Sequence, residues 1–134
     1  MDNGTAPQDS PTTAPAPTPY ELIGGEAGVR RLVDCFYDIM DTDPGAATIR
    51  AMHGPDLGPI RQTLFEFMSG WLGGPRLYTR CVRSAHAPFT IGTAERDEWL
   101  MCMKRALVEA DVSAPVRKIL EQPFFAMADF MRSH

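Results

Sequence analysis

The chain has 134 residues and a formal net charge of −4, with 44% hydrophobic and 22% charged residues. This length predicts one folded domain. The basic residues are scattered rather than clustered, which argues against nucleic acid as a partner, and no stretch approaches the ~20 apolar residues of a membrane span.

The first nineteen residues differ in composition from the rest of the chain. Residues 1–19 carry five of the twelve prolines and only two charges, so they can bury little apolar surface. We expect a disordered Pro/Thr/Ala-rich tail at 1–19 and one folded domain at 20–134. The first twenty residues contain no Lys or Arg and no apolar run, so no signal or transit peptide is expected. The odd number of widely spaced cysteines fits reduced thiols in a cytoplasmic protein.

The first half of the domain shows strong helix signals. Thr18-Pro19-Tyr20-Glu21 supplies a capping oxygen, a first-turn proline and a capping-box glutamate, and Gly24-Gly25 should end that helix after about one turn. From Glu26 onward the spacing of the apolar residues predicts a long amphipathic helix with these positions buried: Val29, Leu32, Val33, Phe36 and Met40. Asp43-Pro44 opens a short helical segment that should end near residues 52–55.

The second half continues in the same way. A third helix is predicted from Ile60 to Trp71, ended by Gly73-Gly74-Pro75. Residues 75–92 show no sustained period and are predicted to be a loop. Thr93 should cap the next helix, and a last helix should start near Ser113 and kink at Pro123. No segment alternates with period two, so the predicted class is all-α.

His86 is the residue in the predicted loop with the most chemical interest. The sequence has no Gly-x-Ser-x-Gly, no phosphate-binding glycine loop and no His-Glu-x-x-His. A histidine just before Pro88 is often an ordinary loop residue. It could also pair with Cys81 on zinc, although two further ligands are not evident. A helical domain with one loop histidine also suits haem, whose iron needs one strong protein ligand.

Several motifs occur together and in a fixed order. They are Tyr20-Glu21-Leu22-Ile23-Gly24-Gly25-Glu26-Ala27-Gly28, Phe36-Tyr37, Gly70-Trp71-Leu72-Gly73-Gly74-Pro75 with Leu77-Tyr78, His86-Ala87-Pro88-Phe89, and Glu95-Arg96-Asp97-Glu98-Trp99-Leu100. Over residues 20 to about 131 the chain resembles the group II truncated haemoglobins, short globins of bacteria and plants. The resemblance implies a globin-like, two-over-two sandwich of helices.

The resemblance also implies a haem site. By it, His86 is the proximal ligand of the iron in haem b (iron protoporphyrin IX), and Tyr37 and Trp99 are the distal residues that stabilise the ligand. Arg83 matches a basic position that helps hold a haem propionate. The other cofactor-binding positions that it implies are His53, Ile60, Leu64 and Tyr78.

Each distal residue also has a simpler interpretation. Trp99 fits a large core residue, which the apolar stripe alone favours, and Tyr37 fits a buried tyrosine bonded to a backbone carbonyl. His53 fits a polar residue in the turn before Gly54. The functional interpretation is that dioxygen on ferrous haem gains partial negative charge, so the Tyr37 O–H and the Trp99 N–H would make charge-assisted hydrogen bonds that slow its release.

The segment between Tyr78 and His86 departs from the family pattern. His86 follows Tyr78 by eight residues, a shorter separation than the family usually has. Eight residues still span at most ~26–29 Å, enough to reach the proximal side of a haem, so we expect binding with an altered proximal segment. Ile60 is bulkier than the small residue often found there and could narrow ligand entry.

The expected function is a haem protein that binds dioxygen and other diatomic ligands such as nitric oxide. The resemblance implies oxidation of nitric oxide to nitrate or peroxidase-like chemistry, with an unidentified reductase, in a monomer or homodimer. Slow oxygen release would favour chemistry or sensing over oxygen transport. The alternative is a haem-free helical interaction or sensor module.

Overall fold

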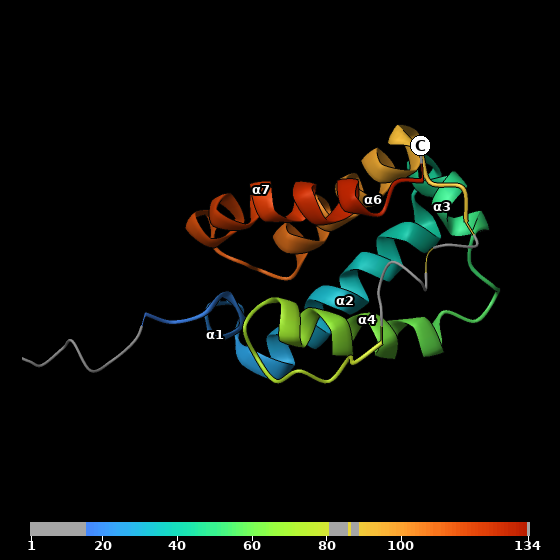
Figure 1. Cartoon of the computed structure of the whole chain (residues 1–134). Coiled ribbons are helices and arrows are strands. Elements are labelled where there is room, and N and C mark those ends of the chain that lie inside the picture. Colours follow the sequence, from blue (N-terminus) through green and yellow to red (C-terminus); the bar gives the residue numbers. More distant parts are fainter. Residues whose placement is uncertain (1–15, 81–85, 87–88, 134) are drawn as a thin grey trace, which may run out of the picture.

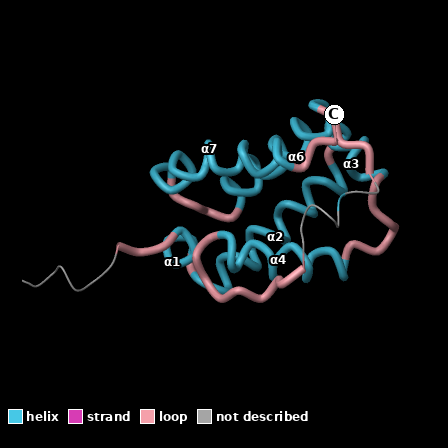
Figure 2. The backbone as a smooth tube through the Cα atoms, viewed as in Figure 1, coloured by secondary structure: helices cyan, strands magenta, loops and turns pink. Residues whose placement is uncertain are grey.

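Four long helices form two antiparallel pairs, one lying over the other (Figure 1). A computed structural model of the chain describes residues 16–80, 86 and 89–133. The elements in order are α1 (Pro19–Ile23), α2 (Gly25–Thr42), the 3₁₀ helix η2 (Pro44–Ala46), α3 (Ala47–Ala51), α4 (Gly58–Trp71), α6 (Thr93–Glu109) and α7 (Ala114–Phe130). Helices α2 and α4 form one pair and α6 and α7 the other, and the described residues contain no strand (Figure 2). The predicted all-α, two-over-two architecture is confirmed.

Helix α2 is the central element of the sandwich. It contacts α1, α3, α4 and α6, and its predicted apolar stripe is buried, with Val29, Leu32 and Phe36 fully inaccessible to solvent. The helix begins directly after α1 because Gly24 takes a φ of 116°, a left-handed conformation that glycine adopts without strain. Burial of this stripe therefore places every other element relative to α2.

The predicted start of α1 is also the place where the N-terminal end of the domain attaches to α4. The Thr18 hydroxyl accepts from the Glu21 N–H at 3.2 Å, and the Glu21 carboxylate accepts from the Thr18 N–H at 3.0 Å, which confirms the capping box. The Tyr20 N–H donates to the Leu72 carbonyl at 2.9 Å. The Tyr20 ring covers Gly74 so closely that a Cβ there would lie 2.4 Å from the ring. The glycine turn after α4 thus serves as the docking site for α1.

Two local predictions in the second half have different outcomes. The prediction that Thr93 caps α6 is wrong, because Thr93 is the first helical residue and Gly92 is the N-cap. The Glu95 carboxylate accepts from the Gly92 N–H at 2.7 Å and supplies the cap from inside the helix. Pro123 lies within α7, which continues through it from Ala114 to Phe130; the kink stays a prediction.

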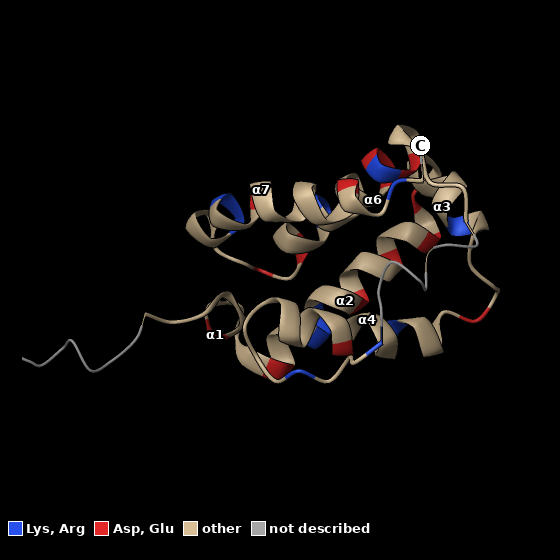
Figure 3. Ribbon diagram, in the orientation of Figure 1, with Lys and Arg blue, Asp and Glu red and all other residues tan. Residues whose placement is uncertain are grey.

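Charged residues are spread over both helix pairs, with acidic and basic residues interspersed (Figure 3). Among the described residues, no helix is both long and apolar enough to cross a membrane.

The close contact between α1 and α2 gives a test of the fold. A Cβ on Gly28 would lie 2.1 Å from the Ile23 carbonyl oxygen, so Gly28→Ala must push the two helices apart. Alanine is favoured over glycine by about 0.8–1 kcal/mol in a helix interior, yet we expect Gly28→Ala to lower the free energy of unfolding by about 1–3 kcal/mol. Urea unfolding measures it.

Gly54→Ala is the control, because a Cβ there meets nothing within 4 Å. Its effect should stay within about 0.5 kcal/mol. A Gly28→Ala variant as stable as the wild type would contradict the described packing of α1 on α2.

Candidate functional site

An apolar cavity of about 240 Å³ lies among the helices. Side chains from α2, α3, α4, α6 and α7 line it, together with residues of the segment that precedes α6. The cavity brings together every predicted site residue that the structure describes, namely Tyr37, His53, Ile60, Leu64, Tyr78, His86 and Trp99. Arg83 lies outside the described residues, as does Cys81, the other predicted zinc ligand.

Tyr37 is the buried polar group of this cavity. Its side chain follows Phe36 by one step of about 100° around α2, so Phe36 faces the core while Tyr37 faces the cavity. Tyr37 is only 4% exposed, and burial raises the pKa of its hydroxyl far above the ordinary value, although the positive charge of Arg61 opposes the shift. No described residue makes a hydrogen bond to that hydroxyl, so the predicted alternative of a backbone carbonyl partner is not seen there.

Trp99 belongs both to the core and to the cavity wall. Its ring centroid lies 5.2 Å from that of Phe36 and 6.0 Å from that of Phe124. Phe124 in turn stacks on Trp71 at 4.7 Å. Trp99 lines the cavity and Trp71 does not. The two interpretations of Trp99 are therefore compatible, since one side of the ring packs on the core while the residue contributes to the cavity.

His53 lies just after α3 and contributes to the wall beside Tyr37. The two ring centroids are 5.9 Å apart in an edge-to-face arrangement, and Nδ1 of His53 lies 2.8 Å from the Ile49 carbonyl oxygen. His53 is thus part of both the turn and the cavity wall, so its two interpretations, as a turn residue and as a cavity residue, are compatible.

Helix α4 supplies an apolar wall. Ile60, Thr63, Leu64 and Phe67 line the cavity at helical spacing. The Phe67 ring meets the Tyr78 ring edge to face at 6.0 Å. Phe67 is not among the site residues predicted from the sequence; its seven-residue spacing from Ile60 is the signal that it shares the wall.

Helix α7 and its C-cap contribute two methionines that are not among the site residues predicted from the sequence. Met127 and Met131 both line the cavity, as do Met40 and Met52 on the other side of the fold. Their i, i+4 spacing indicates a shared face but does not distinguish a core face from a cavity face. Flexible thioether side chains suit a wall that must adapt to an irregular ligand.

The segment after His86 is tied to the C-terminal turn. The Phe89 N–H donates to the His86 carbonyl at 3.0 Å. Three hydrogen bonds join Ile91 and Ser133. The Ile91 N–H donates to Ser133 Oγ and the Ser133 N–H to the Ile91 carbonyl, each at 2.8 Å, and the Ser133 hydroxyl donates to the same carbonyl at 3.3 Å. Nearby, Asp129 on α7 bonds Arg96 on α6 at 2.9 Å. These bonds hold the chain on the His86 side of the cavity against α6 and α7.

Comparison with known proteins identifies the family. The model of the bacterial-like globin family matches residues 18–133, beginning two residues before the predicted domain. A group 2 truncated haemoglobin of Bacillus subtilis, YjbI, is 34% identical over 107 residues, which cover 76% of this chain and 78% of that protein.

Two solved structures agree in sequence and in fold. The cold-adapted truncated haemoglobin of Pseudoalteromonas haloplanktis has a TM-score of 0.83 and 42% identity, covering 88% of this chain and 99% of that one. A group II two-on-two haemoglobin of Agrobacterium tumefaciens has a TM-score of 0.83 and 40% identity, covering 90% and 98%.

The chain belongs to the bacterial-like globin family. Within that family it is a truncated haemoglobin of group II. Membership implies a haem cofactor and haem-based oxygen binding.

The site fits such a group, because an apolar cavity suits the macrocycle and the buried Tyr37 hydroxyl is a donor with no hydrogen-bond partner among the described residues. A buried donor without a partner costs about 1–3 kcal/mol, which a bound polar ligand would offset.

The raised pKa of Tyr37 predicts a change of stability at alkaline pH. Folded Tyr37 keeps its proton, whereas the unfolded chain releases it above about pH 10, so this residue lowers the free energy of unfolding as the pH rises, by up to about 1.4 kcal/mol per pH unit. Tyr37→Phe should therefore lose stability less steeply than the wild type between about pH 10 and 11. Parallel curves in urea unfolding at each pH would contradict the described burial.

Proposed function

We propose that this chain holds haem b in the described cavity, with His86 as the iron ligand and Tyr37 and Trp99 on the side where a diatomic ligand binds. The observation that carries the proposal is the buried Tyr37 hydroxyl, which has no partner among the described residues and faces the same cavity as His86. Haem, when bound, supplies an iron that coordinates dioxygen, nitric oxide or a similar ligand and places partial negative charge on it. Arg83 remains the proposed partner of a propionate.

The roles of the protein groups follow from their chemistry. The Tyr37 O–H and the Trp99 N–H are donors to a ligand with partial negative charge, and such hydrogen bonds are about twice as strong as neutral ones. Ile60, Leu64 and Phe67 exclude water from this side, which strengthens those bonds further. Slow ligand release favours chemistry or sensing over transport, so we propose nitric oxide oxidation or peroxidase-like turnover, supported by a reductase that is not yet identified.

Haem binding through His86 is tested by the absorption spectrum. The purified or reconstituted chain should show a Soret band, and His86→Ala should lose it or bind haem far more weakly. The rival proposal, a haem-free interaction or sensor module, predicts that a folded chain shows no Soret band after reconstitution with haem. That outcome would contradict the haem proposal.

The roles of Tyr37 and Trp99 are tested by the rate of oxygen dissociation. Tyr37→Phe and Trp99→Phe each remove one donor to a charged ligand, worth about 1.5–3 kcal/mol, so each should speed dissociation about 10- to 100-fold.

The matched control is Trp71→Phe, which removes an indole that stacks on Phe124 but does not line the cavity. Its dissociation rate should stay close to that of the wild type. If all three variants dissociate oxygen like the wild type, Tyr37 and Trp99 are packing residues only.

A further inference from the structure

The short helix α3, which leads into His53, is fastened at both ends by charged side chains. At its start, the Ile49 N–H donates to the Glu98 carboxylate at 3.0 Å. Glu98 lies on α6 directly before Trp99. A carboxylate at a helix N-terminus satisfies a free N–H and is favoured by the helix dipole. The first end of α3 is thus tied to the helix that carries Trp99.

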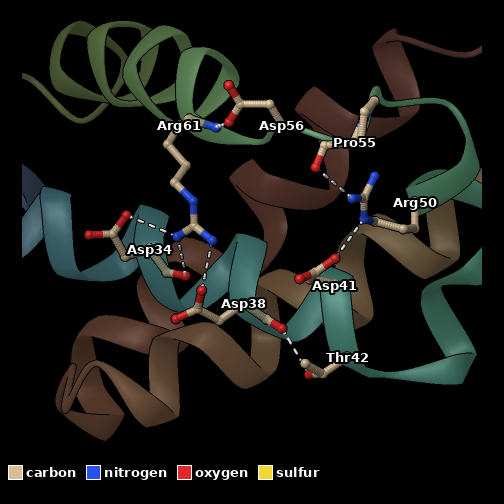
Figure 4. Close-up of polar contacts among 9 residues, drawn as sticks. Asp34, Asp38, Asp41, Thr42, Arg50, Pro55, Asp56 and Arg61 are labelled. Atoms are coloured by element: carbon tan, nitrogen blue, oxygen red, sulfur yellow. Dashed lines mark hydrogen bonds and ion pairs between the residues drawn. The ribbon is translucent and has the colours of Figure 1, made fainter.

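At the other end, one arginine binds α2 and the turn that follows α3. Nε of Arg50 lies 2.8 Å from Oδ1 of Asp41 on α2. Its two terminal nitrogens donate to three successive carbonyls, those of His53 at 3.5 Å, Gly54 at 2.9 Å and Pro55 at 3.4 Å. Figure 4 shows the guanidinium between Asp41 and Pro55. Arg50 therefore fixes the backbone of His53 relative to the helix that carries Tyr37.

The His53 ring is oriented by the same short helix. Nδ1 lies 2.8 Å from the Ile49 carbonyl oxygen, and a carbonyl can only accept a hydrogen bond, so Nδ1 carries the proton. In the neutral ring the lone pair is then on Nε2. No described residue makes a hydrogen bond to Nε2. His53 therefore brings a hydrogen-bond acceptor to the wall beside Tyr37.

We infer that Arg50 is a positioning residue that holds His53 as the Nδ1–H form, with Nε2 as an acceptor in the cavity that the donors Tyr37 and Trp99 also line. This inference deepens the proposed function and rests on it for the identity of the ligand, but not for the geometry. Two donors and one acceptor suit a small molecule that both accepts and donates hydrogen bonds. Hydrogen peroxide has this property, whereas dioxygen, nitric oxide and carbon monoxide only accept.

The first test is the protonation pattern of His53 in ¹⁵N NMR spectra of the full chain. The spectra are recorded without haem and with reconstituted haem, the haem-loaded sample being the diamagnetic carbon monoxide form. The wild type should show Nδ1 protonated and Nε2 not. Arg50→Met should lose this single pattern and give a mixture of the two neutral forms. Arg50→Lys should give an intermediate mixture, since an ammonium can bind Asp41 but cannot bridge the three carbonyls.

Arg61→Met is the matched control. Arg61 also joins another helix to α2, through Asp34 at 3.1 Å and Asp38 at 2.7 Å, and its guanidinium lies 5.9 Å from the centre of the Tyr37 ring, but it makes no hydrogen bond to residues 53–55 (Figure 4). This variant should keep the wild-type His53 pattern. A wild-type pattern in Arg50→Met, or Nε2 protonated in the wild type, would overturn the positioning role.

The second test compares two ligands in stopped-flow experiments on the haem-loaded chain. His53→Phe and Arg50→Met should slow the reaction of the ferric form with hydrogen peroxide by about 10- to 100-fold, where about 100-fold is the smallest effect typical of a well-positioned proton acceptor. Carbon monoxide binding should change by less than about threefold, because this ligand has no proton to give to Nε2. Equal effects on both ligands would overturn the ligand class, while absence of a Soret band would overturn the haem proposal alone and leave the NMR test valid.

Discussion

The burial of one face of α2 is the constraint on which the rest of the structure depends. Val29, Leu32 and Phe36 are fully inaccessible to solvent, so α2 cannot rotate without exposing the centre of the core. Tyr37 follows Phe36 by one helical step and faces the cavity. The position of its hydroxyl is therefore set by core packing rather than by a hydrogen bond. A donor held in this way is available to a ligand without first breaking another interaction.

The neighbouring elements extend this preorganisation. An aromatic series from Tyr37 through Phe36, Trp99 and Phe124 joins α2, α6 and α7, with centroid distances of 5.0, 5.2 and 6.0 Å. Hydrogen bonds hold the short connecting segments, which bury too little apolar surface to be fixed by packing. The Arg50 contacts hold the turn after α3, and the Ile91–Ser133 bonds hold the segment after His86. Apolar packing thus sets the helices, while hydrogen bonds set the loops that complete the cavity.

The sequence was sufficient for most of the helices because periodicity and caps are local. The Thr18–Glu21 capping box and the stripe of α2 follow directly from residue spacing. The prediction that Thr93 caps α6 was wrong, because the helix begins one residue earlier and the Glu95 carboxylate bonds the Gly92 N–H. Residue type alone does not decide which of the two neighbouring positions is the N-cap. The methionines of α7 could not be assigned to the cavity, since a helical stripe looks the same against a core or a ligand. The Arg50 contacts depend on the orientation of α3 and leave no spacing signal.

The central claim is that His86 binds iron on one side of the cavity while the Tyr37 hydroxyl is the hydrogen-bond donor to a ligand on the other side. The most direct measurement is the resonance Raman spectrum of the ferrous, ligand-free chain loaded with haem that contains either ⁵⁴Fe or ⁵⁷Fe. An iron–histidine stretching band that shifts with iron mass, disappears in His86→Gly and returns with added imidazole is the predicted result. A haem-loaded chain whose spectrum has no such band, or keeps it in His86→Gly, would contradict the claim.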